Sequence, residues 1–532
     1  MTTEGHELSA KIYIPKSASA ENPAPAILAA PGGNASLENL TAVSSELSRR
    51  GYIVLAFDPY TIGRSDAVNT SDVGSAAALD YLMSLDIVDK EHIGAVGHSA
   101  GSGRVAAAVT SPDGGIREGV KAVMYLGAGS FNLQGVNMGV FIGSFDNTYG
   151  QGRITVWDIF TADPFVSQVG VTEIENGKWY GDVNEGTAKV LYSGFSGHTS
   201  ALFLPAPIQA TVDFFDTALI KAPNPQGGLV YGWKALGTTL GLVAMLLIMF
   251  NIVALCVYTK FFATIKRERT EAVSGVNAPF LFYFITPAII NALVCAWAIY
   301  NGQMLLKNIS ILRINNVNGF VFWFGFSTLL SLGILIVRFI WDKKIDRKKV
   351  VNHAKIKPSN YGKALLLGVI ALCTLYALTY LSETLWVLSP RAWKLQINLL
   401  TPDRMLLFVT YFPLYLIFFS VFNYNHTIGL RLKGQSEGKF TALVWLSSAF
   451  PVILFLGFTY GKLFLTGYTA ITNVQMSRAN SSLLCNFLTY FVICKVTTFF
   501  YKKTGSFHTG AIINAAIMTW VAIGTDLVTA VL

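Results

Sequence analysis

The sequence of 532 residues contains only five cysteines, and none of them lies in the first 232 residues. Because this N-terminal part cannot form disulfides, its stability has to come from an apolar core. The five cysteines lie in strongly apolar runs, where cysteine usually serves as a small packing residue. They are Cys256, Cys295, Cys373, Cys485 and Cys494. The sequence has no zinc-site spacing and no nucleotide, flavin or other metal motif, so we expect no cofactor.

Charged residues are also scarce: they make up 13% of the chain, whereas hydrophobic residues make up 52%. The charges are unevenly distributed. Residues 1–232 contain 13 Lys and Arg against 23 Asp and Glu, a net charge of −10, and residues 233–532 hold the remaining 27 basic and 8 acidic residues. The positive net charge of the whole chain therefore comes from its apolar second half, and it does not indicate a nucleic-acid partner.

Eight apolar runs of about 20 residues follow the Pro/Gly-rich stretch KAPNPQGG at 221–228. A helix of this length can cross roughly 30 Å of hydrocarbon. The sequence therefore predicts a first domain over 1–220, a linker over 221–232 and a transmembrane domain of about eight helices over 233–532. The runs lie near 235–258, 280–300, 319–340, 363–387, 404–423, 440–460, 481–500 and 510–532.

Basic residues flank these runs unevenly. The segments after the first, third, fifth and seventh runs carry 19 Lys and Arg, against 8 in the alternate segments. Positive loops remain in the cytoplasm, so this distribution predicts a multi-pass protein in the lipid bilayer with an extracytoplasmic N-terminal domain. Residues 1–20 contain no apolar segment that could export such a domain. We therefore expect an upstream signal anchor outside this chain, with an inverted topology as the alternative.

Within the first domain, short apolar runs alternate with segments of helical periodicity. Strands are predicted at 25–33, 52–58, 92–99, 121–128, 139–146 and 187–194, and helices at 36–51, 74–88, 99–110 and 206–220. Apolar strands that are separated by helices indicate a parallel sheet covered on both faces.

A glycine-framed serine, Gly97-His98-Ser99-Ala100-Gly101, lies between one predicted strand and the following helix. A G-x-S-x-G sequence in this position forms a sharp turn that exposes the serine hydroxyl, and its glycines permit close backbone approach. The turn also places the N–H of Ala100 at a helix N-terminus, where it can stabilise an oxyanion. The alternative is an ordinary glycine turn. His98 is expected to point away from the site into packing.

Over roughly residues 5–220 the chain resembles the α/β-hydrolase fold family. The resemblance rests on GHSAG, on APGGN at 30–34 and on FDPYTIGRSD at 57–66. It implies an α/β fold with a mostly parallel sheet and helices on both faces. The family places its oxyanion turn at APGGN, which assigns the second oxyanion donor to the N–H of Gly33, with Asn34 as the alternative.

The family's chain order is serine, acid, histidine, which implies that Ser99 is the nucleophile. His198 is the only histidine between residue 100 and the end of the domain, and it follows the last predicted strand, where the family places its base. Asp146 ends the predicted strand 139–146 and is assigned as the acid, with Asp158 and Asp163 as reserves. The alternatives are a solvated loop histidine and a turn-forming aspartate.

Only about ten residues separate the predicted strands 121–128 and 139–146, so we expect no cap domain there. The resulting prediction is a membrane-tethered serine hydrolase that cleaves an ester, amide or peptide bond in a small-molecule, lipid or peptide substrate. One alternative is an acyltransferase that uses the same residues. Another is a transporter or sensor with a non-catalytic α/β ligand-binding domain. We also expect the membrane half to contribute to substrate selection.

Overall fold

The structure is a computed structural model. It describes residues 2–3, 5–148, 155–220, 227–270, 278–341, 343, 346–393 and 395–528. The chain divides into two compact units. The first comprises Met1–Gly237, Thr459–Ser477 and Thr525–Leu532, and the second comprises Thr238–Phe458 and Arg478–Gly524. Residues 221–226 of the predicted linker lie outside the described residues, whereas residues 227–230 lead into the helix α6 (Tyr231–Tyr258).

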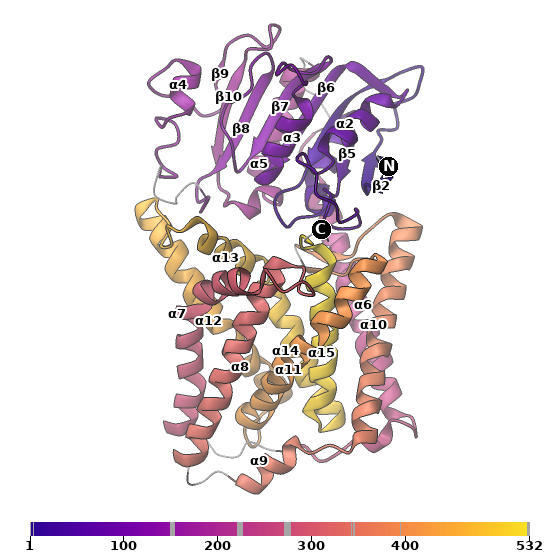
Figure 1. Ribbon diagram of the computed structural model, residues 1–532, viewed down its shortest axis with the longest axis vertical. Helices are drawn as coiled ribbons and strands as arrows, with labels where there is room; N and C mark the ends of the chain where they lie inside the picture. Colours follow the sequence, from indigo (N-terminus) through magenta and orange to yellow (C-terminus); the bar gives the residue numbers. More distant parts are fainter. Residues whose placement is uncertain are drawn as a thin grey trace. The chain divides into compact units, whose positions relative to one another are not determined.

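The first unit is built on a sheet of eight strands in the order β3-β5-β4-β6-β7-β8-β10-β9 (Figure 1). Its strands are β3 (Ala10–Tyr13), β4 (Ala24–Ala30), β5 (Ile53–Phe57), β6 (Val88–His98), β7 (Val120–Leu126), β8 (Asn137–Gly143), β9 (Trp179–Tyr180) and β10 (Lys189–Gly194). Among these strands, the edge strands β3 and β9 run antiparallel to their neighbours and all other pairs are parallel. A short antiparallel pair, β1 (Thr2–Thr3) and β2 (His6–Glu7), precedes the sheet.

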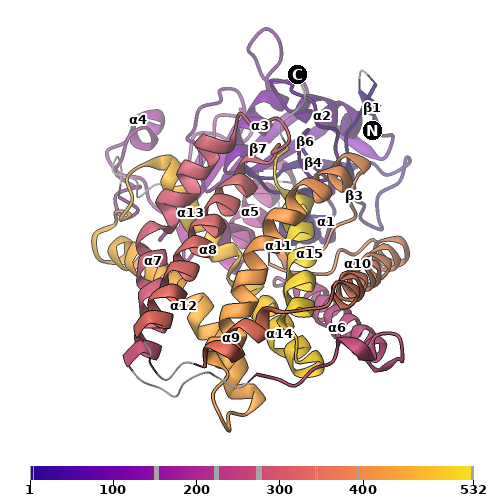
Figure 2. The same cartoon turned by 60° about the horizontal axis from the view of Figure 1, so that its bottom comes forward.

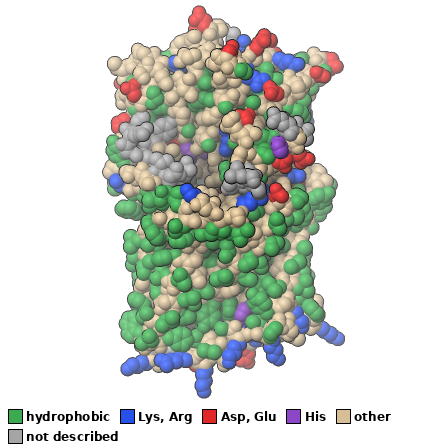
Figure 3. Space-filling view, in the orientation of Figure 1, with side chains coloured by type: hydrophobic (Ala, Val, Ile, Leu, Met, Phe, Trp, Pro, Cys, Tyr) green, Lys and Arg blue, Asp and Glu red, His purple; other side chains and the backbone are tan. Residues whose placement is uncertain are grey.

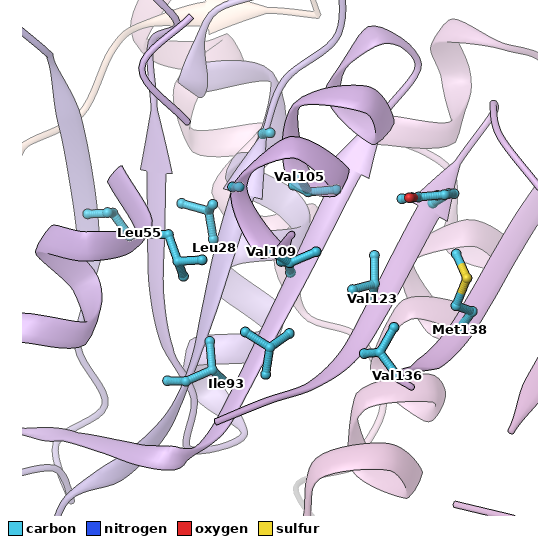
Figure 4. Close-up of a cluster of buried hydrophobic side chains, with 14 of the residues drawn as sticks. Leu28, Leu55, Ile93, Val105, Val109, Val123, Val136 and Met138 are labelled. Atoms are coloured by element: carbon cyan, nitrogen blue, oxygen red, sulfur yellow. The ribbon is translucent and has the colours of Figure 1, made fainter. Parts of the chain in front are cut away.

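Helices cover both faces of this sheet. One face packs against α2 (Ser75–Ser84) and α3 (Ala100–Val109), and the other against α1 (Thr41–Arg49) and α5 (Pro205–Phe215). Successive residues of β4 alternate between the two cores, with Leu28 in the first and Ile27 in the second. Figure 4 shows the first core, where Val105 and Val109 of α3 pack over the strands beside Leu28 and Ile93. Burial on both faces explains the continuous apolar sequences of β4 and β5.

The observed elements agree with the predicted ones for all six strands, with ends that differ by a few residues. Residues 127–136 connect β7 to β8 without a helix or strand. This mostly parallel sheet with helices on both faces is the α/β-hydrolase fold. The short elements without a counterpart in the prediction include α4 (Phe165–Val169), with 5 residues, and β9, with 2 residues.

The second unit is helical. Seven helices in the described part of the chain are long and apolar enough to cross a membrane, which is the pattern of a multi-pass membrane protein. They are α6 (Tyr231–Tyr258), α7 (Ala278–Leu306), α8 (Asn315–Trp341), α10 (Pro358–Trp386), α11 (Pro402–Leu430), α12 (Glu437–Thr466) and α15 (Phe507–Thr525).

The apolar run predicted as a span at 481–500 has a different structure. It contains the end of α13 (Val474–Cys485) and most of α14 (Phe487–Thr504), with a break at Asn486. The 18 residues of α14 include three lysines, so this helix is less apolar than the seven others. The count of membrane-capable helices is therefore seven rather than eight in the described residues.

Four helices of the second unit pack around a shared apolar cluster. An apolar cluster joins α6, α10, α14 and α15, and α6 and α10 lie side by side (Figures 1 and 2). Figure 3 shows Lys and Arg side chains gathered at one end of the apolar helices, the end that carries the basic helix α9 (Arg347–Ala354). This end holds basic loops from which the sequence analysis predicted the topology. That these loops face the cytoplasm stays a prediction.

Candidate active site

Ser99 occupies the sharp turn between β6 and α3. Its backbone has φ 52° and ψ −119°, a conformation that non-glycine residues rarely adopt. The Ser99 N–H donates to the carbonyl of Leu126 at 2.9 Å, which fixes the turn to the end of β7. Such a strained backbone is expected for the serine of a G-x-S-x-G turn, which exposes its hydroxyl at the end of a parallel sheet.

The two glycines that frame the serine are required by close backbone contacts. A methyl group on Gly97 would lie 2.3 Å from the carbonyl oxygen of Gly101, and one on Gly101 would lie 2.2 Å from the carbonyl oxygen of Ala30. No side chain fits at either distance. The first turn of α3 therefore lies directly against the end of β4.

Three of the predicted side chains form one chain of hydrogen bonds. His198 Nε2 lies 2.9 Å from Ser99 Oγ, and His198 Nδ1 lies 3.1 Å from Asp146 Oδ2. A carboxylate can only accept, so Nδ1–H donates to Asp146 and Nε2 is left to accept the serine proton. Asp146 is fully buried, and its other oxygen accepts from the Thr148 N–H at 2.8 Å.

Asp146 does not lie in a strand, as the sequence predicted, but in a turn after β8. The strand ends at Gly143, and the Asp146 N–H donates to the Gly143 carbonyl at 3.0 Å. The strand stops there because the chain crosses the loop before His198: a methyl group on Gly143 would lie 2.0 Å from the carbonyl oxygen of Ser196. This close crossing brings the aspartate to the histidine.

The two reserve aspartates, Asp158 and Asp163, are exposed. The carboxylate of Asp158 accepts from the hydroxyl of Thr155, three residues earlier in the chain. Among the described residues, Asp146 is the carboxylate that contacts His198.

His98 is buried, as expected, but it packs toward the site rather than away from it. Its Nε2–H donates to the backbone carbonyl of His198 at 2.9 Å, and the two rings have centroids 5.1 Å apart. His98 therefore fixes the backbone that carries His198. The sequence contained one signal of this role, since His98 is adjacent to Ser99 on the elbow.

The predicted oxyanion turn lies against the serine elbow. A methyl group on Gly32 would lie 3.3 Å from Ser99 Cβ, and one on Gly33 would lie 3.9 Å from Ala100 Cβ. The backbones of Gly33 and Ala100 are thus neighbours. Asn34, the alternative donor, has φ 52°, so the chain turns sharply directly after Gly33.

Arg104 of α3 holds this turn in place, a role that the sequence did not reveal. Its Nη1 donates to the carbonyls of Pro31 at 2.6 Å and Gly32 at 3.1 Å. Burial lowers the pKa of the Arg104 guanidinium to about 10, so it remains charged at neutral pH. With the two carbonyls turned toward Arg104, the N–H groups of the turn are free to face the other way.

Gly127 was also not predicted to belong to the site. It follows β7 with φ +67°, and a methyl group there would lie 3.2 Å from both Asp146 Oδ2 and His198 Nδ1. The absence of a side chain leaves room for this hydrogen bond. No cluster of three or more His, Cys, Asp or Glu suited to a metal ion occurs among the described residues.

No protein-family model matches the chain. Two curated proteins align with part of it: Uncharacterized protein PA2218 of Pseudomonas aeruginosa is 28% identical over 130 residues, and Uncharacterized protein YcjY of Escherichia coli is 32% identical over 109 residues. The alignments cover 23% and 19% of this chain. The chain spans only about a third of the length of these relatives, 34% and 35%.

Solved structures with a similar fold include two esterases. Est1E of Butyrivibrio proteoclasticus, solved with bound ferulic acid, is 17% identical, with 41% of this chain and 97% of that chain covered and a TM-score of 0.29. The esterase Est2 of Thermogutta terrifontis, solved with bound butyrate, is 18% identical, with 41% and 90% covered and a TM-score of 0.30. A likeness at this level does not assign an activity to this chain.

Proposed function

We propose that this chain is a membrane-tethered serine hydrolase that cleaves an ester, amide or peptide bond through an acyl-enzyme. The observation that carries the proposal is the hydrogen-bonded series Ser99, His198 and Asp146 at the carboxyl ends of the sheet, with Ser99 in a strained turn. In an α/β sheet this edge is where ligands bind.

In the proposed first step, Ser99 Oγ attacks the carbonyl carbon of the substrate while its proton passes to His198 Nε2. The Asp146 carboxylate accepts the Nδ1–H bond throughout, which keeps the imidazole in the reactive tautomer and stabilises the imidazolium. The substrate oxygen gains a negative charge, which the N–H groups of Ala100 and Gly33 stabilise.

In the second step, the tetrahedral intermediate collapses and the leaving group takes the proton from His198. Water then attacks the acyl-enzyme with His198 again acting as the base, which releases the acid and restores Ser99. His98 and Arg104 act as positioning residues, since they contact the backbones of His198 and of the oxyanion turn.

The test uses the full chain in detergent and a panel of p-nitrophenyl butyrate, the matched anilide and a short peptide. We expect release of p-nitrophenol by the wild-type chain and a loss of about 10⁶ in kcat for Ser99→Ala. If added alcohol diverts the acyl group into a new ester, the chain is an acyltransferase. A wild-type chain that binds substrates without turning any of them over contradicts the proposal and favours a binding module.

We further propose that the first unit lies outside the cytoplasm, because the loops after α6, α8 and α11, which alternate along the seven membrane-capable helices, carry 16 of the 27 basic residues of the second half together with the adjoining helix ends. The structure describes four cysteines, and none of them lies in the first unit. A label on a cysteine that is introduced into the first unit can therefore be assigned to that position. We expect Glu175→Cys, at an exposed position, to react with an impermeant maleimide in intact cells. Reaction only after permeabilisation would contradict this topology.

A further inference from the structure

A cavity of about 130 Å³ lies in the second unit, and its lining residues come from α7, α8, α11, α12 and α14. An apolar cavity of roughly 150 Å³ is large enough to bind benzene, so this one can hold a single ring or a short chain. No Lys, Arg, Asp or Glu is among the described residues that line it. An ionic ligand would therefore have no counter-charge, and the occupant has to be neutral.

Aromatic rings form much of the wall. Phe324 of α8 stacks on Phe418 of α11 with ring centroids 4.3 Å apart, and Trp323 and Tyr490 also line the space. Such a wall favours a flat apolar group, which can pack against ring faces and edges.

Several polar groups also line the cavity, and most of them already have partners. Asn291 Oδ1 accepts from Trp323 Nε1 at 3.1 Å and from Ser327 Oγ at 2.6 Å. His426 Nδ1 donates to the Phe422 carbonyl at 2.7 Å, and its Nε2 lies 2.7 Å from the hydroxyl of Ser447. These groups are positioned by the protein and need no ligand.

Asn425 differs from these groups. It lines the cavity, it is 6% exposed, and its carboxamide oxygen makes no hydrogen bond to any residue that the structure describes. A buried acceptor without a donor costs about 1–3 kcal/mol. A neighbouring donor would remove this cost, and none of the residues that the structure describes supplies one.

Two prolines leave further carbonyl acceptors at the cavity without their usual donors. Pro287 in α7 and Pro451 in α12 line the cavity and have no N–H. The carbonyls four residues earlier, of Tyr283 and Ser447, therefore lack their usual helical donor, and both of these residues also line the cavity.

We propose that this cavity binds a small neutral molecule or group in which an apolar ring or short chain carries a hydroxyl or N–H donor. The donor bonds to the Asn425 oxygen, and the apolar part packs among the aromatic rings. This inference does not depend on the proposed hydrolase activity, because every residue that carries it belongs to the second unit.

The test is a pair of probes that differ in one group: 4-fluorophenol, which has a donor, and 4-fluorotoluene, which has nearly the same size and none. Each is titrated against the full chain in phosphatidylcholine nanodiscs and followed by ¹⁹F NMR, with empty nanodiscs to subtract partition into lipid. We expect saturable binding of 4-fluorophenol, about tenfold tighter than that of 4-fluorotoluene, which is the effect of one hydrogen bond to a buried acceptor.

Asn425→Leu keeps the side-chain size and removes the oxygen, so it should bind both probes equally. Asn423→Leu is the matched control: it makes the same change two residues away on α11, at a buried position that is not among those lining the cavity, and it should keep the preference. Should Asn425→Leu fail to fold, Ser331→Phe replaces it, because a ring at this partly exposed lining position fills the cavity and should abolish binding of both probes.

Four results would overturn the proposal. For the wild-type chain, these are equal affinity for the two probes and no saturable binding of either probe, which would mean that the cavity holds water only. For the variants, they are an Asn425→Leu chain that keeps the preference for 4-fluorophenol and a Ser331→Phe chain that binds both probes as the wild type does.

Discussion

His198 Nε2 lies 2.9 Å from Ser99 Oγ, although 99 residues separate the two in sequence. The strand order explains the contact. Ser99 follows β6 and His198 follows β10, and β6, β7, β8 and β10 are consecutive parallel neighbours. Their carboxyl ends therefore meet at one edge of the sheet, and Asp146, after β8, joins them there.

Asp146→Asn should lower kcat by roughly 10⁴ without unfolding the chain. An amide at this position can donate to Nδ1, and it therefore favours the tautomer in which Nε2 carries the proton and cannot accept that of Ser99. The measurement is hydrolysis of a p-nitrophenyl ester. Asp158→Asn is the control and should keep wild-type turnover, since its exposed carboxylate bonds to Thr155.

Arg104→Met should lower kcat roughly tenfold to hundredfold, somewhat less than the 10²–10³ that follows removal of an oxyanion donor. The turn keeps its N–H groups but loses the guanidinium that holds the carbonyls of Pro31 and Gly32. Arg104→Lys should restore only part of the activity, because an ammonium lacks the planar fork of donors. Arg117→Met, which removes a guanidinium paired with Asp80, should leave kcat unchanged.

Two glycines of the same helix should respond in opposite ways. Gly101→Ala places a methyl group 2.2 Å from the Ala30 carbonyl oxygen, whereas one on Gly103 meets nothing within 4 Å. We expect Gly103→Ala to stabilise the chain by about 0.5–1 kcal/mol, since alanine is the better helix former. Gly101→Ala should destabilise it by about 1–3 kcal/mol and abolish turnover. Thermal unfolding and ester hydrolysis together report both effects, and equal melting temperatures for the two variants would contradict the account.

The buried Glu46 of α1 anchors the start of α6. Its carboxylate accepts from Arg50 Nη1 at 2.6 Å and from the N–H groups of Val230 at 2.6 Å and Tyr231 at 2.5 Å. Glu46→Ala removes the carboxylate that accepts from the buried Arg50 and from two backbone N–H groups, so we expect a loss of about 3–5 kcal/mol, or roughly 10 °C in Tm. Glu175→Ala, in an exposed pair with Lys178, should not change the Tm.

The same site predicts a pH dependence. Burial alone would raise the pKa of Glu46, but the hydrogen bonds from Arg50, Val230 and Tyr231 outweigh it and hold the pKa below its usual value. The stabilisation is thus complete above the unfolded-state pKa of about 4.3 and is lost as the pH falls through the lower folded-state pKa. The Tm difference between wild type and Glu46→Ala should therefore shrink in acid. A difference that grows on acidification would contradict this sign.

Local sequence signals were sufficient to predict much of the structure of the first unit. The apolar strands and the G-x-S-x-G turn each depend on neighbouring residues, and His198 could be assigned because the domain offers so few histidines. The contact between Asp146 and His198 was predicted, although the strand before Asp146 was predicted to end three residues too late. That error arose because the close crossing of Gly143 and Ser196 depends on a partner more than 50 residues away.

The positioning contacts were not predictable in the same way. Arg104 reaches carbonyls 72 and 73 residues earlier in the chain, and Glu46 accepts from a backbone N–H 184 residues later. A single sequence carries no local signal for such pairs. The break at Asn486 was missed for a related reason, because average apolarity does not show where one helix ends and the next begins.

The measurement that tests the central claim most directly is the site of covalent labelling by a fluorophosphonate, which reacts only with an activated serine. The full chain in detergent is labelled, digested and examined by mass spectrometry. The account predicts one adduct, on Ser99, that is absent from Ser99→Ala and forms far more slowly in Asp146→Asn. An adduct on another serine, or labelling that persists in Ser99→Ala, would contradict it.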